Sequence, residues 1–174
     1  ARPAASLIGA ADQRLAPVMA EVFARRGLVA LIVRGQDGLD EVTVGGDTDV
    51  WDVTDSSQGV RGFSLSPSGV GLSVRDPEHL IGADVAFNAS VATAVLSGKG
   101  EGQLASVRDA VILNTAAALV AYDAATGERR YGATTDSVST RVAAAVPAAW
   151  EAIASGAAAE KLTAWAALSR SLAG

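Results

Sequence analysis

The sequence predicts an α/β domain, a layered sheet flanked by helices, and three observations support this fold class. Residues 28–33 are continuously apolar, which is the pattern of a strand buried on both faces. A helical apolar period runs directly into this strand. Residues 107–121 are so uniformly apolar that they predict a central buried helix. The length of 174 residues suits one domain with its own core.

The first predicted helix lies in residues 12–27, DQRLAPVMAEVFARRG. Asp12 is expected to cap its start, and Gly27 lies where a left-handed residue ends a helix. Pro17 lacks a backbone N–H, so the regular helix should begin close before it. Its apolar residues recur at helical spacing and predict the buried face: Leu15, Val18, Met19, Val22 and Phe23.

Strands are predicted on both sides of a glycine-rich turn in EVTVGGDTDVWDV. Val42 and Val44 alternate on one side of residues 45–47, and Val50 and Val53 follow on the other. Glycines at the turn supply the positive φ that a tight hairpin needs. The sequence therefore predicts a β-hairpin after residues 34–41. A third short strand is expected within residues 59–66.

The remainder of the chain is predicted to be helical. Asp84 can cap a helix that Gly98 closes. Ser106 and Asp109 have the spacing of a capping box at the start of the buried helix. Two amphipathic helices should follow a polar connection and meet near Gly156.

Composition excludes several classes of site. The net charge is −5, and the 14 basic residues form no cluster, which argues against a nucleic-acid surface. The chain has no cysteine, so disulfides and thiolate metal sites are excluded. His79 is the only histidine and is expected at the surface. Asn88 and Asn114 fall within predicted helices and are expected to form helix–loop hydrogen bonds in the core. No uninterrupted apolar run reaches the roughly 18 residues that span a bilayer, so no membrane segment is expected.

The segment RGQDGLDEVTV, residues 34–44, places Asp37, Asp40 and Glu41 within five residues. Loops at the carboxyl ends of buried strands are where α/β sheets bind ligands. Neighbouring carboxylates repel each other, and hard oxygen ligands select Mg²⁺ or Ca²⁺. Asp40 and Glu41 fit the sparse coordination of Mg²⁺ better than a full Ca²⁺ cage. If they bind a metal ion, Asp40 and Glu41 are expected to face a shared solvent-accessible cleft at the end of the strand, while Asp37 stabilises the loop. The alternative is an ordinary solvated turn in which Asp37 hydrogen-bonds its own loop.

Several segments resemble the anthranilate phosphoribosyltransferase family, in the same order along the chain. They are LIVRGQDGLDEVTV, LSPSGVGL, GADVAFNASVATAVLSGKG and RDAVILNTAAALVA. The resemblance implies part of the nucleoside phosphorylase/phosphoribosyltransferase α/β domain. It also implies transfer of the phosphoribosyl group of phosphoribosyl pyrophosphate (PRPP) to anthranilate, with release of pyrophosphate, in cytoplasmic tryptophan biosynthesis. By the same resemblance, Asp40 and Glu41 bind a Mg²⁺ cofactor.

The chain departs from the family pattern in informative ways. Arg34 stands where the family usually has histidine, and Ala83 interrupts a Gly-Gly-Asp motif. The glycine-rich PRPP loop and the small helical domain that makes the family homodimer have no counterpart. Residues 1–174 therefore resemble a single-domain fragment, the C-terminal part of the catalytic domain, and the opening ARPAAS suggests a cut end.

Three functions are compatible with these departures. The first is a phosphoribosyltransferase portion, inactive and poorly dimeric alone, with no catalytic residue assigned to it. The second is a non-catalytic binding module that keeps the fold. The third is a related pentosyltransferase with a different acceptor. Retention of both Asp40 and Glu41 favours the first.

Overall fold

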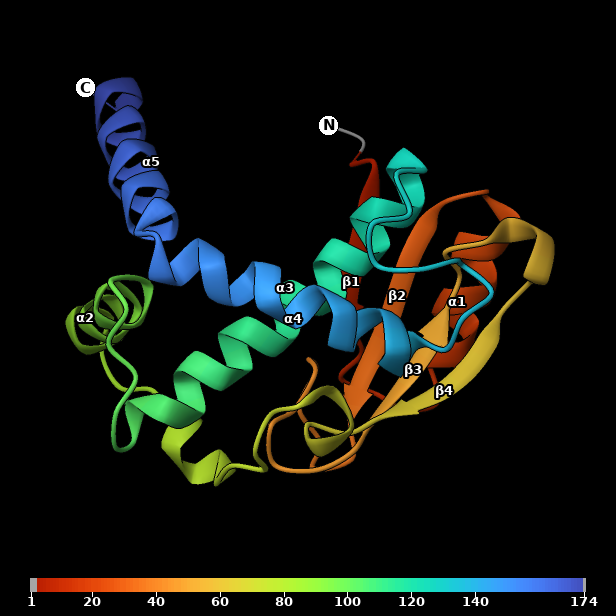
Figure 1. Ribbon diagram of the computed structural model, residues 1–174, viewed down its shortest axis with the longest axis horizontal. Helices are drawn as coiled ribbons and strands as arrows, with labels where there is room; N and C mark the ends of the chain where they lie inside the picture. The colour runs from red at the N-terminus through yellow and green to blue at the C-terminus, as the bar shows by residue number, and fades with distance from the viewer. Residues whose placement is uncertain (1–2, 174) are drawn as a thin grey trace.

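The computed structural model describes residues 3–173 (Figure 1). The expected cut end at residues 1–2 lies outside the described residues. A four-stranded sheet has the order β1-β2-β3-β4. The strands are β1 (Ala5–Gly9), β2 (Val29–Gly35), β3 (Thr48–Asp52) and β4 (Arg61–Leu65). β1 and β2 are parallel, whereas β3 is antiparallel to both β2 and β4.

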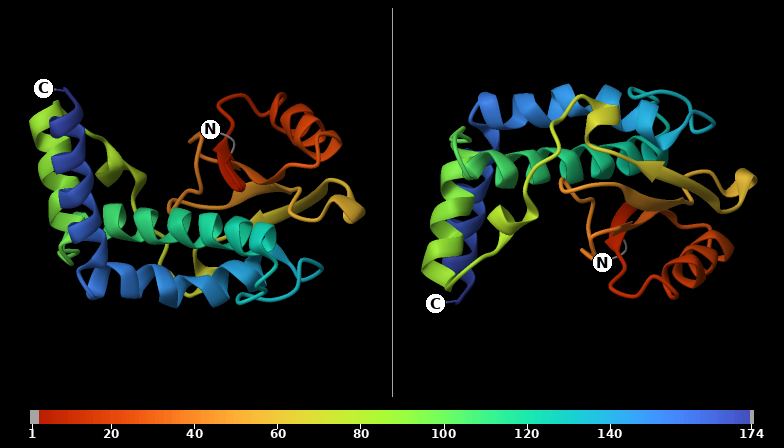
Figure 2. Two further views of the ribbon diagram at one scale, coloured as in Figure 1. Left: turned by 90° about the horizontal axis from the view of Figure 1, so that it is seen from above. Right: turned by 90° about the horizontal axis from the view of Figure 1, so that it is seen from below.

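Helices cover both faces of the sheet, as predicted (Figure 2). α1 (Ala16–Arg25) connects β1 to β2 and packs against β2 and β3. On the other face, α3 (Leu104–Thr126) packs against β1 and β2, and α4 (Val138–Ala154) lies along α3. The remaining helices are α2 (Val85–Leu96), α5 (Ala157–Ala173), and the short 3₁₀ turns η1 (Ser56–Gln58), η2 (Ser68–Val70) and η3 (Pro77–Leu80).

The prediction of a central buried helix is confirmed by α3. Ile112 and Leu113 are both 0% exposed. By length and mean hydropathy alone, α3 is long and apolar enough to cross a membrane. Its contacts with the sheet and with α4 instead identify it as a core helix. Burial of each large side chain stabilises the fold by about 1.5–3 kcal/mol.

α2 and α5 lie side by side, away from the sheet (Figures 1 and 2). α4 and α5 differ in direction by 63°. Gly156 lies at the break with φ of 83°, a left-handed conformation that suits glycine. The predicted break near this residue is confirmed. The predicted cap of α2 is also confirmed, because Asp84 accepts a hydrogen bond from the Phe87 N–H at 2.8 Å.

The predicted buried face of α1 is partly wrong. Leu15, Val18 and Val22 are 55%, 57% and 41% exposed. Ala16 and Ala20 are fully buried instead, with Met19 and Phe23 packed beside their cluster. Small side chains let the helix backbone approach the sheet closely, so the alanine row faces inward.

The start of α1 also differs from the prediction. Asp12 accepts a hydrogen bond from the Arg14 backbone N–H at 2.9 Å, in a turn before the helix, and does not cap it. The Arg14 side chain also hydrogen-bonds Asp12 and lowers the pKa of that carboxyl. At the other end, Gly27 has φ of 62°, as expected.

The predicted strand at Val42 and Val44 is wrong. Both side chains are buried in the core, 1% and 0% exposed, but their backbone pairs with no strand among the described residues. Tertiary burial beneath α3 explains their apolar character. The hairpin predicted after residues 34–41 is therefore formed by β3 and β4, and β4 matches the expected third strand.

Two further features differ from the sequence prediction. β1 was not predicted, because its short apolar segment runs directly into a helical pattern. The capping box at Ser106 and Asp109 is wrong, since α3 begins at Leu104. Ser106 lies 3.1 Å from the His79 ring, and Asp109 pairs with two arginines.

Candidate metal site in the acidic loop

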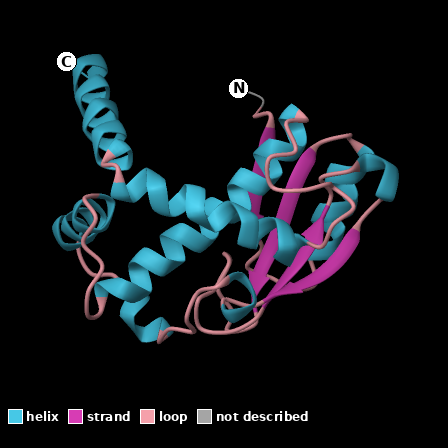
Figure 3. Cartoon of the chain, viewed as in Figure 1, coloured by secondary structure: helices cyan, strands magenta, loops and turns pink. Residues whose placement is uncertain are grey.

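The acidic loop, residues 36–47, leaves the carboxyl end of β2 (Figure 3). Asp37 holds this loop together: one carboxylate oxygen accepts a hydrogen bond from the Leu39 N–H at 3.2 Å, and the other accepts one from the Thr43 hydroxyl. Gly38 has φ of 101°, which permits the tight turn between them. The expectation that Asp37 stabilises its own loop is confirmed.

The loop folds back closely over the ends of both parallel strands. A Cβ atom at Gly9 in β1 would overlap the backbone carbonyl of Asp40. A Cβ atom at Gly35 in β2 would meet the Asp37 carboxylate. Glycine at these two positions lets the loop backbone pack against the strand ends, and this contact fixes the position of the residues that follow Gly38.

Asn114 of α3 anchors the other side of the loop. Its Oδ1 accepts a hydrogen bond from the Val42 N–H at 3.0 Å, and its Nδ2 donates to the Val42 carbonyl at 2.8 Å. Val42 immediately follows Glu41. The helix–loop role expected for Asn114 is therefore confirmed. The acidic pair lies between two anchors, Asp37 on one side and Asn114 on the other.

The carboxylates of Asp40 and Glu41 have no structural role among the described residues. Both residues are exposed, and neither side chain has a hydrogen-bond or ion-pair partner in residues 3–173. Cavities of about 570, 510 and 300 Å³ lie elsewhere and are not lined by either residue. The pair therefore lies on open surface, and these cavities do not provide the cleft that was expected.

The two carboxylates fit a sparsely coordinated cation. Within residues 3–173, no cluster of three His, Cys, Asp or Glu side chains could enclose a metal ion. Mg²⁺ is commonly bound through one or two carboxylates, with water and phosphate oxygens completing its octahedron. Asp40 and Glu41 supply two unpaired oxygen donors on an anchored backbone. The residues present thus fit Mg²⁺ shared with a phosphate ligand.

Arg34, which stands where the family usually has histidine, is not a free cation, because its side chain is bonded to backbone carbonyls. Its Nη1 donates to the carbonyls of Ala10 at 2.9 Å and of Ala11. It is half-buried and ties the segment after β1 to β2. Arg34 therefore stabilises the strand ends on which the acidic loop rests.

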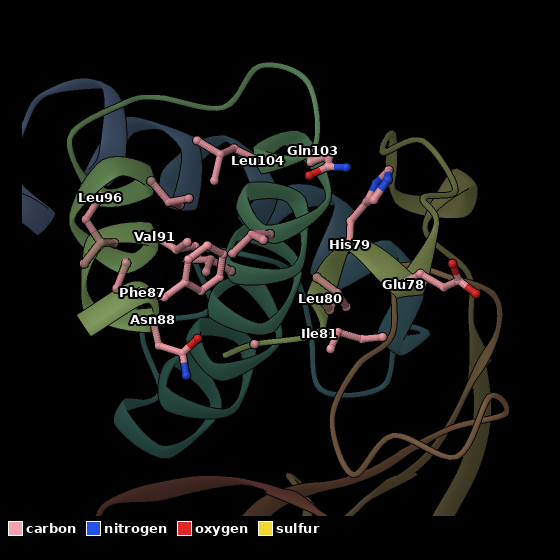
Figure 4. Close-up of a pocket in the computed structure, with 15 residues that line it drawn as sticks. Glu78, His79, Leu80, Ile81, Phe87, Asn88, Val91, Leu96, Gln103 and Leu104 are labelled. Atoms are coloured by element: carbon pink, nitrogen blue, oxygen red, sulfur yellow. The ribbon is translucent and has the colours of Figure 1, made fainter. Parts of the chain in front are cut away.

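A concave region lies away from the acidic loop, between α2, α3 and η3 (Figure 4). This cavity of about 570 Å³ is mostly apolar, and the Phe87 ring points into it. His79 forms part of its wall and is half-buried, so the expectation of a surface histidine is only partly met. Asn88 makes the expected helix–loop bonds, accepting from the Ala83 N–H at 3.0 Å and donating to its carbonyl at 3.1 Å, but it is exposed and not in the core.

A βαβ unit with an oxygen-rich loop at the shared carboxyl ends of its strands defines an α/β ligand-binding domain. A family model described as "Glycosyl transferase family, a/b domain" matches residues 1–159. The chain therefore belongs to this glycosyl transferase family. It is 45% identical over 165 residues to the anthranilate phosphoribosyltransferase of Acidothermus cellulolyticus, covering 95% of this chain and 42% of that protein. The Thermobifida fusca enzyme of the same name is also 45% identical, with 95% and 43% covered.

Solved structures show the same fold. Anthranilate phosphoribosyltransferase from Saccharomyces cerevisiae in complex with PRPP and Mg matches with a TM-score of 0.71 and 29% identity, over 91% of this chain and 41% of that one. The Thermus thermophilus enzyme matches with a TM-score of 0.62 and 31% identity, over 90% and 41%. The chain thus spans less than half the length of these relatives.

Proposed function

We propose that this chain is the magnesium-binding portion of an anthranilate phosphoribosyltransferase. The complete enzyme would transfer the phosphoribosyl group of PRPP to the amine of anthranilate and release pyrophosphate, in tryptophan biosynthesis. The observation that carries the proposal is the exposed, unpaired Asp40–Glu41 pair between two anchors. Family membership and 45% identity to enzymes of this name support it.

Asp40 and Glu41 would hold the Mg²⁺, and Asp37 and Asn114 would fix where their oxygens lie. Bound Mg²⁺ neutralises the negative charge that develops on departing pyrophosphate. The amine of anthranilate is already a nucleophile, so correct placement of the two substrates supplies much of the rate. No general base in this chain is required.

Further properties remain predictions from the resemblance. PRPP and anthranilate would bind together with a polypeptide portion that this chain does not match. The complete enzyme would be a cytoplasmic homodimer, and the 174-residue chain alone would neither catalyse transfer nor dimerise stably. Residues 1–174 would then be a single-domain fragment of the catalytic domain.

The test combines this chain with the unmatched part of the Acidothermus cellulolyticus relative, as a fusion or by co-expression. Pyrophosphate release from PRPP is measured with and without anthranilate. The chain alone should give none, and the combined protein should give anthranilate-dependent release. In the combined protein, Asp40→Asn and Glu41→Gln should each slow release by at least about tenfold at limiting Mg²⁺, equivalent to about 1.4 kcal/mol.

Asp47→Asn is the matched control, because Asp47 is an exposed carboxylate of the same loop and lies outside the pair. It should leave turnover unchanged. Equal turnover in all three variants at limiting Mg²⁺ would contradict the metal assignment. Release that proceeds only with another amine acceptor would identify a related pentosyltransferase. A combined protein that binds PRPP without any turnover would favour the binding module.

A further inference from the structure

A small polar cavity of about 80 Å³ lies between the C-terminal half of α3, the connection that follows it and the first turn of α4. Its wall includes the side chains of Asp123 in α3 and Arg141 in α4. No residue of the acidic loop lines it. The cavity is therefore a feature of the helical layer, and its contents are a separate question from the metal site.

Arg141 supplies a buried hydrogen-bond donor to this cavity. The residue is 2% exposed, and its Nη1 donates to the Thr54 hydroxyl at 3.1 Å and its Nη2 to the Asp52 carboxylate. Its Nε has no hydrogen-bond partner among residues 3–173. Leaving a buried charged donor unpaired costs stability, and buried polar groups are normally paired with protein or with ordered water. The Nε–H group therefore calls for an acceptor that is not a protein atom.

Asp123 supplies unused acceptors to the same cavity. The residue is 6% exposed. One carboxylate oxygen accepts a hydrogen bond from the Arg130 N–H at 2.9 Å, and the other accepts one from the Tyr131 N–H at 3.3 Å. A carboxylate has about four lone-pair sites, so acceptor capacity remains on both oxygens. The cavity thus combines a charged donor with a charged acceptor.

This combination selects a neutral occupant. An anion bound to the Arg141 Nε would share the cavity with the Asp123 carboxylate, and a cation bound to Asp123 would share it with the guanidinium group. Either repulsion is strong where the effective dielectric constant is low. A molecule that both accepts and donates hydrogen bonds fits both walls. The volume suits roughly two or three water molecules, since each occupies about 30 Å³ in the liquid.

We infer that this cavity is a binding site for ordered water, in which water accepts a hydrogen bond from the Arg141 Nε and donates to the Asp123 carboxylate. The bound water links α3 to α4 and extends the hydrogen-bond network of Asp52. Gly132 holds the connection closely over the site: its φ is 114°, and a Cβ atom there would lie 3.5 Å from the Arg141 Cγ. The site is independent of the proposed function.

The direct test is a crystal structure of the full 174-residue chain at a resolution that shows ordered water, with a bromide-soaked crystal beside it. Water should lie about 2.7–3.2 Å from the Arg141 Nε, and bromide should give no anomalous peak in the cavity. A bromide peak there would overturn the inference in favour of an anion site. A cavity with no density within hydrogen-bonding distance of Nε would also overturn it.

A matched pair of variants tests the same site in solution. Ala124 lines the cavity, and Ala124→Thr and Ala124→Val would insert side chains of the same shape. Both displace water, but only threonine offers a hydroxyl in its place, and the two residues have similar helix propensities. The equilibrium constant for unfolding in urea should be at least about tenfold larger for the valine variant. Equal constants would contradict the inference.

The background Arg141→Met provides the control. It removes the Nε donor, while Asp52 keeps its ion pair with Arg61 at 2.6 Å. The difference between the threonine and valine variants should shrink to less than about threefold there, because one polar wall of the cavity is lost. An undiminished difference would show that Arg141 does not hold the water. If a variant fails to fold, the crystal structure of the unmodified chain decides.

Discussion

Carboxylates in the interior of the domain and those in the acidic loop have opposite surroundings. Asp52 and Asp109 are each 1% exposed, and each contacts two arginines. Asp40 and Glu41 are exposed and contact no cation among residues 3–173. A buried charge requires a counter-charge, whereas exposed charges remain solvated. The contrast separates carboxylates that stabilise the fold from those available to a ligand.

The largest loss of stability should follow Asp52→Ala. Asp52 pairs with Arg61 at 2.6 Å and with Arg141, and it accepts the Thr54 N–H at 2.8 Å. Arg141 is 2% exposed and would remain as an uncompensated buried charge. Urea denaturation should show a loss of about 3–5 kcal/mol in the free energy of unfolding.

The control is a double variant, Asp52→Ala with Arg141→Met. It should recover part of the loss, because the more deeply buried of the two unpaired charges, Arg141, is removed, while the Arg61 side chain is 17% exposed and can reach water. Arg141→Met also removes the bond that Arg141 Nη1 donates to the Thr54 hydroxyl at 3.1 Å, so the recovery should be incomplete. A loss below about 1 kcal/mol for Asp52→Ala would show that this network does not stabilise the fold.

Asp109→Ala should lower the free energy of unfolding by less than Asp52→Ala does. Asp109 pairs with Arg75 at 2.7 Å and with Arg108 at 2.9 Å. The side chains of these arginines are 31% and 19% exposed, so water can reach them when the carboxylate is removed. Arg108 also stacks over the Trp150 ring at 4.5 Å. The expected loss is about 1.5–3 kcal/mol in the same denaturation experiment. A cost equal to that of Asp52→Ala would contradict the role of solvent access.

Asp37→Ala should have a smaller effect, confined to the loop. Its hydrogen bond with the Thr43 hydroxyl is partly buried, and a typical intramolecular hydrogen bond contributes about 1 kcal/mol. Thr43→Val should cost a similar amount, and a double-mutant cycle should show that the two losses overlap. Fully additive losses would indicate that the bond contributes nothing in solution.

The smallest effect is expected at the acidic pair itself. In the absence of Mg²⁺, Asp40→Asn and Glu41→Gln should change the free energy of unfolding by no more than about 0.5 kcal/mol. Any change should be towards higher stability, because each variant removes a repulsion between neighbouring charges. Thermal melts in a chelator measure this. A loss above about 1 kcal/mol would place the pair with the structural carboxylates.

The features that were predicted correctly are those that depend on local sequence patterns. β2 and α3 were predicted because long apolar runs have few alternatives. Asp40 and Glu41 were singled out as neighbouring charges, and their exposure agrees with that role. Contacts between distant segments could not be predicted in this way. Asn114 bonds to Val42 across 72 residues, and it overrides the strand pattern there.

The misassigned face of α1 has a similar cause. Leu15 and Val18 have the helical spacing of a buried face, yet Ala16 and Ala20 lie against the sheet. Periodicity identifies the helix but does not decide which row of small or large residues fits a given helix–sheet distance. The replacement of histidine by Arg34 was visible, but its bonds to Ala10 and Ala11 required the structure.

The contact between Gly9 and the Asp40 carbonyl bears on how mutational tolerance maps of this chain should be read. Gly9 has no side chain and would touch no ligand, yet even alanine there would push the acidic loop away from β1. Such a map would mark Gly9 as intolerant while the exposed Asp40 and Glu41 accept many substitutions in a folding screen. A search for ligand-binding residues by folding tolerance alone would therefore select the glycine and overlook the carboxylates beside it.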